Sequence, residues 1–117
     1  MKRYLQTKTT ENGERGNCLA TSLGCLLEIP VSHIPAFEEM ERSAWRPALT
    51  AWLREQGYTL TTLNEAPQGF AIGVGWRADG VLHAFIVNDG EFYHDPNPAS
   101  NFVESVRNYW QLIPLNE

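Results

Sequence analysis

The fold is decided by one stretch of the chain, Gly16-Asn17-Cys18-Leu19-Ala20-Thr21-Ser22-Leu23-Gly24-Cys25-Leu26-Leu27-Glu28. At 100° per residue its leucines fall on one face of a helix, and this face is expected to pack against a core. The apolar stripe consists of Leu19, Leu23, Leu26 and Leu27. Cys18 projects about 100° away from the middle of this stripe, beside Ser22. The core therefore holds Cys18 in place without enclosing it.

The position of Cys18 in the first turn of this helix suits a nucleophile. The unpaired N–H groups and the positive end of the helix dipole favour an anion there, and hence the thiolate form of cysteine. A structural role is the alternative, because free cysteine is among the most buried residue types and packs as a small hydrophobe. Cys25 lies two turns further on, about 10 Å along the axis, which is too far for a disulfide. A catalytic role for Cys18 therefore requires a base elsewhere in the chain.

Length and composition indicate one domain, which we place at residues 1–117. The chain is 43% hydrophobic and 20% charged, and its net charge of -5 disfavours nucleic acid or an anionic membrane as a partner. No apolar run reaches the length of a membrane span and the N-terminus lacks a signal-peptide pattern, so we expect a cytoplasmic protein. The acidic cluster of Glu38, Glu39 and Glu41 is interpreted as a solvated loop.

Hydrophobic periodicity predicts that the first helix runs from Asn17 or Cys18 to Glu28 and stops before Pro30. Residues 1–7 precede it as a short strand or an extended lead-in. The polar, glycine-containing segment between them is interpreted as a loop.

A second helix is predicted between Ser43 and Gly57. Ser43 is expected to act as the N-cap, Pro47 is tolerated in the first turn, and Gly57 supplies the C-terminal stop. Its apolar stripe is expected to lie in the core and consists of Trp45, Ala48, Leu49, Trp52 and Leu53.

The chain after Gly57 has the character of strands. Pro114 predicts that the last strand lies at an edge of the sheet, because proline has no N–H to donate. Helices followed by an antiparallel sheet define an α+β fold, with the N-terminal helices packed on the sheet. The predicted strands cover residues 58–63, 70–76, 81–87, 91–95 and 109–115.

The stretch from His83 to Asp95 is expected to form a hairpin that places a histidine beside a carboxylate. A three-residue loop, Asn88-Asp89-Gly90, fits a type I turn with glycine in the left-handed conformation, and it pairs His83 with Asp95. Opposed residues share a face with Cβ atoms about 5 Å apart, so Asp95 is placed to accept the imidazole N–H. A two-residue Asp89-Gly90 turn remains open. It shifts the register so that His83 opposes Pro96 and Asp95 points to the other face.

Cys18, His83 and Asp95 together supply a nucleophile, a base and a group that orients the base. The blocks that contain them resemble the motifs of papain-like cysteine peptidases, and most closely those of the peptidases that cut double-glycine leader peptides. The resembling residues are Gly16-Asn17-Cys18-Leu19-Ala20-x-x-Leu23, His83-Ala84-Phe85-Ile86-Val87 and Asp95-Pro96. The resemblance implies a central helix on an antiparallel sheet, a minimal papain-like fold, with Cys18 as nucleophile, His83 as base and Asp95 as orienting acid.

The same resemblance points to an oxyanion donor. Such families place a glutamine six residues before the cysteine, and Asn12 stands at that position here. Asn12 and the backbone N–H of Cys18 are the candidate donors. Leu19 stands where the leader peptidases often have glycine. His94 falls on the opposite face of the predicted hairpin from His83 and is assigned a structural or surface role.

The leading hypothesis is a cysteine hydrolase that cleaves an amide or isopeptide bond of a peptide or protein substrate through an acyl-enzyme, without a cofactor. A peptidoglycan cross-link is an equally suitable amide. The alternative is a catalytically inactive papain-like fold that serves as a binding or interaction module. A metal site built from Cys18, Cys25, His83 and Asp95 is disfavoured, because the cysteines lack the short spacing of structural zinc sites.

Overall fold

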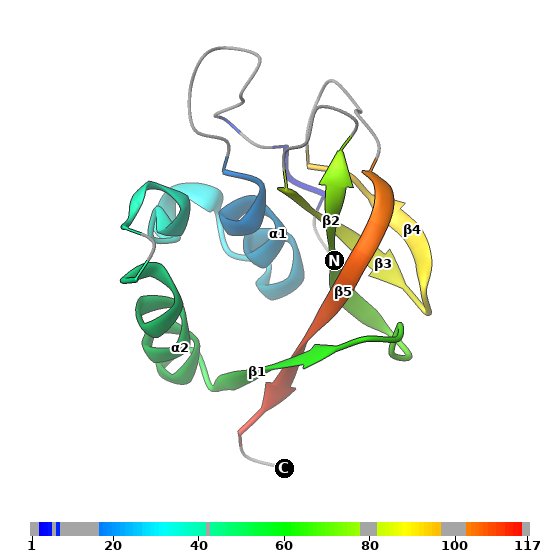
Figure 1. Ribbon diagram of the computed structural model, residues 1–117. Helices are drawn as coiled ribbons and strands as arrows, with labels where there is room; N and C mark the ends of the chain where they lie inside the picture. Colours follow the sequence, from blue (N-terminus) through cyan, green and yellow to red (C-terminus); the bar gives the residue numbers. More distant parts are fainter. Residues whose placement is uncertain are drawn as a thin grey trace.

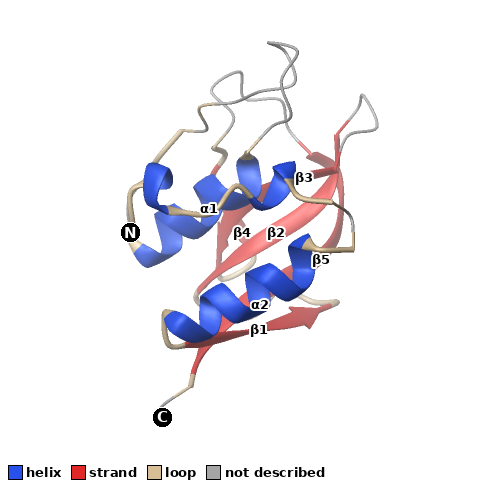
Figure 2. Ribbon diagram, turned by 90° about the vertical axis from the view of Figure 1, so that its left-hand side faces the viewer, coloured by secondary structure: helices blue, strands red, loops and turns tan. Residues whose placement is uncertain are grey.

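The computed structural model of the protein describes residues 3–5, 7, 17–41, 43–77, 82–96 and 103–115. Within these ranges, the helices come first and the strands follow, so the α+β prediction is confirmed. Both α-helices pack on the same face of the sheet (Figures 1 and 2). The helical elements are α1 (Cys18–Leu27), the short 3-10 turns η2 (Val31–His33) and η3 (Phe37–Glu39), and α2 (Trp45–Glu55). The strands are β1 (Tyr58–Leu63), β2 (Phe70–Arg77), β3 (Leu82–Asn88), β4 (Glu91–His94) and β5 (Val103–Pro114).

The sheet is antiparallel throughout, with the strand order β1-β5-β2-β3-β4. The last strand therefore lies between β1 and β2, and the prediction that Pro114 marks an edge strand is wrong. Pro114 is the final residue of β5 and pairs with Tyr58, so its missing N–H affects only the end of the ladder. β5 also begins at Val103, earlier than the predicted 109.

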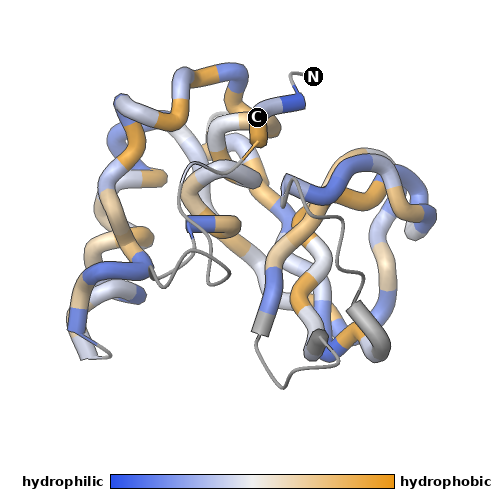
Figure 3. The backbone as a smooth tube through the Cα atoms, turned by 90° about the horizontal axis from the view of Figure 1, so that it is seen from above, coloured by the Kyte–Doolittle hydropathy of each residue, from blue (hydrophilic) through white to orange (hydrophobic). Residues whose placement is uncertain are grey.

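The core lies between the helices and the sheet. Leu19 and Leu23 of the predicted apolar stripe are buried, and they contact a cluster that includes Ile72 and Ile86 of the sheet. Leu26 and Leu27 are partly buried at the margin of this cluster. Hydrophobic and hydrophilic positions are interspersed along the chain (Figure 3), and no helix in the described ranges is long and apolar enough to cross a membrane.

The second helix starts without the predicted serine cap. Its N-cap position is Ala44, which makes no side-chain capping hydrogen bond. The backbone N–H groups of Ala44 and Trp45 instead donate to the carbonyl of Glu41, at 2.9 and 3.1 Å. A preceding turn therefore satisfies these donors, and Ser43 is not needed. Gly57, with φ of +89°, ends the helix as predicted.

The hairpin between β3 and β4 has a two-residue turn, so the predicted three-residue loop is wrong. Asp89 and Gly90 have φ of 52° and 84°, and Asn88 pairs with Glu91. Two successive residues in the left-handed region are typical of a type I′ turn, which Gly90 permits as readily as the three-residue loop.

A β-bulge follows this turn and reverses its effect on the faces of the sheet. Val87 pairs with Phe92, whereas Ile86 pairs with His94, so Tyr93 is an extra residue in β4. Each one-residue shift exchanges the two faces. The bulge therefore returns Asp95 to the face of His83 and leaves His94 on the other face, as the sequence analysis expected.

The sheet face turned away from the helices carries an aromatic contact that depends on glycine. Gly73 pairs with Phe85 across β2 and β3, and a Cβ built on Gly73 lies 2.6 Å from the Phe85 ring. On its other side, the Phe85 ring stacks on Phe92 at a centroid distance of 6.3 Å. The ring therefore occupies the space that a side chain at position 73 would need.

We expect Gly73→Ala to lower the free energy of unfolding by about 1–3 kcal/mol, because overpacking a buried contact forces neighbouring groups to move. Urea unfolding followed by circular dichroism measures the change. The double variant Gly73→Ala/Phe85→Leu is the control, since a smaller residue at 85 removes the overlap. If the double variant lost as much stability as Gly73→Ala and Phe85→Leu together, this explanation would be contradicted.

Candidate active site

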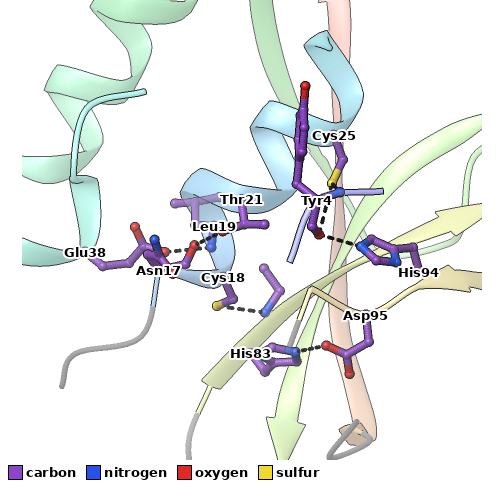
Figure 4. A network of polar contacts seen from close by, with 11 residues as sticks. Tyr4, Asn17, Cys18, Leu19, Thr21, Cys25, Glu38, His83, His94 and Asp95 are labelled. Atoms are coloured by element: carbon purple, nitrogen blue, oxygen red, sulfur yellow. Dashed lines mark hydrogen bonds and ion pairs between the residues drawn. The ribbon is translucent and has the colours of Figure 1, made fainter. Parts of the chain in front are cut away.

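Cys18 occupies the first position of α1, as predicted, and follows the N-cap residue Asn17. It is half-buried and carries a free thiol. The backbone N–H of Ala84 in β3 donates to its Sγ at 3.4 Å (Figure 4). This donor comes from the residue next to His83 and favours negative charge on the sulfur. The helix therefore presents the thiol to the strand that carries the histidine.

His83 and Asp95 form a buried hydrogen-bonded pair. The distance between His83 Nε2 and Asp95 Oδ1 is 2.7 Å, and the two side chains are only 3% and 6% exposed. A carboxylate oxygen accepts, so Nε2 is the nitrogen that carries the donated proton. Nδ1 is then the ring nitrogen that does not contact Asp95 Oδ1. The short turn and the bulge thus produce the contact that the sequence predicted through a different register.

Gly75 of β2 lies opposite His83 in the sheet. It is the direct cross-strand partner of His83, and the register between β2 and β5 shifts next to it, between Val74 and Gly75. Opposed side chains on one face of a sheet come within about 5 Å of each other, so a side chain at Gly75 would compete with the imidazole.

The pKa of His83 is raised by its neighbours. Burial alone lowers it, but the hydrogen bonds to Asp95 and to Cys18 and the charges of both groups outweigh burial. The result is a pKa raised from 6.5 to about 9. This pKa favours the imidazolium form of His83 at neutral pH, next to the Ala84 N–H that contacts the Cys18 sulfur. A positive charge at this place favours negative charge on the sulfur.

Glu38 caps the helix that carries Cys18, so its interpretation as part of a solvated loop is wrong. Its Oε2 accepts the backbone N–H groups of Leu19 at 2.6 Å and Ala20 at 3.3 Å. Burial raises the pKa of Glu38, while these two N–H groups act in the opposite direction. Glu39 remains exposed, as predicted for the cluster. Glu38 lies nineteen residues from Leu19 in sequence, and no local pattern signals this contact.

The cap changes which groups surround the sulfur. Because Leu19 and Ala20 direct their N–H groups to Glu38, the electrostatic support for a thiolate comes mainly from His83 and the Ala84 N–H. The proposed oxyanion donor Asn12 lies outside the described residues. The backbone N–H of Cys18 remains the candidate donor from α1.

A pocket of about 240 Å³ opens beside the first turn of α1. The described residues around it include Asn17, Ala20, Ile34 and Glu38, and none of Cys18, His83 and Asp95. The pocket therefore neighbours the cysteine through Asn17 but lies on the Glu38 side of the helix end.

Cys25, the fourth member of the disfavoured metal site, lies apart from this group. It is fully buried, and its sulfur accepts a hydrogen bond from the backbone N–H of Tyr4. Across the described ranges, no group of three or more histidine, cysteine and acidic residues is arranged to hold a metal ion.

The structure thus brings together three side chains that are distant in sequence: a half-buried thiol, a charged imidazole and a carboxylate bonded to it. No model of a known family matches the chain, and no curated protein or solved structure matches it either. Function is therefore inferred from the geometry and chemistry of these residues.

We expect NMR titration of the wild-type protein to give His83 a pKa of about 9. Asp95→Asn and Cys18→Ala each remove a group that raises this pKa, so both variants shift it towards or below 6.5. Because the pKa of His83 is higher in the folded state, protonated His83 stabilises the fold. This contribution is fully present below pH 6.5 and is lost as the pH rises through about 9. A wild-type pKa of 6.5 or less would contradict the described hydrogen bonds.

Proposed function

We propose that the protein is a cysteine hydrolase that cleaves an amide or isopeptide bond of a peptide or protein through an acyl-enzyme, on a minimal papain-like fold. The observation that carries the proposal is the arrangement of three side chains. The Cys18 sulfur accepts the backbone N–H of Ala84, the residue next to His83, at 3.4 Å, and Asp95 Oδ1 lies 2.7 Å from His83 Nε2. Nucleophile, base and orienting acid are the parts that covalent acyl transfer requires.

The first half of the proposed reaction consumes the stored proton. The Cys18 thiolate attacks the carbonyl carbon, an S–C bond forms, and the carbonyl electron pair moves to the oxygen. When the tetrahedral intermediate collapses, the C–N bond breaks and the leaving amine takes the proton from Nδ1 of His83. The products of this half are a free amine and a thioester on Cys18.

The second half restores the site. Neutral His83 removes a proton from water through Nδ1, and the resulting hydroxide equivalent attacks the thioester carbonyl. The C–S bond breaks, the carboxylic acid leaves, and the sulfur returns to the thiolate beside the reprotonated imidazole. Throughout both halves, the Nε2–H···Oδ1 bond to Asp95 keeps the imidazole ring in one orientation.

The backbone arrangement supports the papain-like assignment. The proposed nucleophile lies at the N-terminus of a helix that packs on β3, and the proposed base lies on β3 itself. This is the relation between helix and sheet that the sequence motifs imply. The oxyanion is assigned to the backbone N–H of Cys18, with Asn12 as a second donor.

We expect iodoacetamide to alkylate Cys18 at pH 6.5 much faster than it alkylates free glutathione, because the proposed base His83 and the Ala84 N–H favour negative charge on the attacking sulfur. Peptide mapping by mass spectrometry locates the label and separates Cys18 from the buried Cys25. A peptide acyloxymethyl ketone is expected to label the same sulfur. Hydrolysis of an unfractionated peptide mixture, read as newly formed amino groups, reports turnover.

The variants have graded expected effects on alkylation and on turnover. Cys18→Ala abolishes both, and His83→Ala lowers turnover by about 10²–10⁴-fold, the usual contribution of a general acid–base. His33→Ala, on the exposed η2, serves as the matched histidine control and is expected to change neither rate. If wild-type Cys18 reacted no faster than glutathione and turned over nothing, the non-catalytic binding module would replace the hydrolase.

A further inference from the structure

The backbone of Tyr4 is held from two sides by groups that the proposed reaction does not use. Its N–H donates to Cys25 Sγ at 3.3 Å, and the Cys25 thiol lies 3.7 Å from the Tyr4 carbonyl. The same carbonyl accepts a hydrogen bond from His94 Nε2 at 2.7 Å. Figure 4 places Tyr4 between Cys25 on α1 and His94 on β4. One backbone unit therefore joins the helix of Cys18 to the strand that precedes Asp95.

Neighbouring residues of the N-terminal segment reinforce this junction. Asn17, next to Cys18, donates through its side-chain amide to Thr7 Oγ1 at 3.0 Å. The guanidinium of Arg3 lies over the ring of Tyr93, 4.5 Å from its centroid. We call Arg3–Leu5 and Thr7 the N-terminal strap. The strap contacts α1 at the N-cap residue Asn17 and at Cys25 in the last turn, and it contacts β4 at Tyr93 and His94.

The strand that the strap contacts is weakly held by the sheet alone. β4 is an edge strand of four residues, its ladder is interrupted by the bulge at Tyr93, and its last registered pair is Ile86 with His94. Asp95 follows that last pair. A short, bulged edge gives His94 few ladder bonds, so its anchoring to Tyr4 is one of the contacts that bear on the position of the next residue, Asp95.

We propose that the N-terminal strap, through the hydrogen bond from His94 to the Tyr4 carbonyl, positions Asp95 and His83 against Cys18. Covalent and hydrogen-bonded links then form a closed circuit: Cys18, α1, Cys25, Tyr4, His94, Asp95, His83, the adjacent Ala84 and back to the Cys18 sulfur. His94 is a positioning residue, since it acts on the site only through its neighbour. The consequence for turnover rests on the proposed hydrolase, whereas the effect on Cys18 does not.

The test compares three histidine variants by the rate of Cys18 alkylation with iodoacetamide at pH 6.5 and by the NMR titration of His83. His94→Ala removes the anchor, and we expect about tenfold slower alkylation and a His83 pKa below the wild-type value. His94→Gln keeps a donor at the position of Nε2 and is expected to stay within about twofold of the wild type. His33→Ala is the control on the exposed η2.

A folded His94→Ala protein with the wild-type alkylation rate and the wild-type His83 titration would overturn the proposal. A uniform loss of stability without a change in the His83 titration would overturn it as well, because that is what a purely structural contact predicts. If His94→Ala does not fold, Cys25→Ala breaks the same circuit at its other junction and is judged by the same two readouts. Absent peptide hydrolysis in the wild type would reject the hydrolase and leave these measurements valid.

Discussion

The hydrogen bond between His83 and Asp95 is the interaction on which the site depends. At 2.7 Å and with both side chains almost fully buried, it determines that Nε2 is the imidazole nitrogen that carries the donated proton. Burial of an unpaired imidazolium would be unfavourable, so the carboxylate is what permits a charged histidine at this depth. The surrounding features relate to this pair in different ways. The bulge at Tyr93 places Asp95 on the face of His83, Gly75 lies opposite His83, and Cys18 contacts the N–H of the adjacent Ala84.

The helix that carries Cys18 is stabilised by a group that competes with the proposed chemistry. Glu38 uses the N–H groups of Leu19 and Ala20, which belong to the turn that would otherwise attract an anion at Cys18. The helix end is thereby capped, and its positive potential is partly neutralised. The imidazolium on β3 and the Ala84 N–H take over the support of a thiolate. Glu38 thus caps the helix, whereas residues of β3 surround the sulfur.

Local patterns in the sequence located both helices, most of the strands and the contact between His83 and Asp95, but not the details that join the elements. The leucine spacing and Pro30 located α1, and alternation located the strands. The hairpin register failed because Gly90 satisfies two kinds of turn and the bulge at Tyr93 leaves no local signal. The Glu38 cap escaped because it is a long-range contact, and Pro114 misled because a strand end tolerates proline even inside a sheet.

The bulge has a consequence for how this hairpin tolerates changes in length. Side chains alternate between the faces of a strand, so what the His83–Asp95 contact requires is a parity rather than a particular loop. Inserting a single residue between the two would bring His94 to the position of Asp95, and removing one would bring Pro96 there, whereas paired changes keep Asp95 on the face of His83. The turn and the bulge therefore compensate for each other. A hairpin without the bulge would need a turn with an odd number of residues to keep His83 and Asp95 on one face.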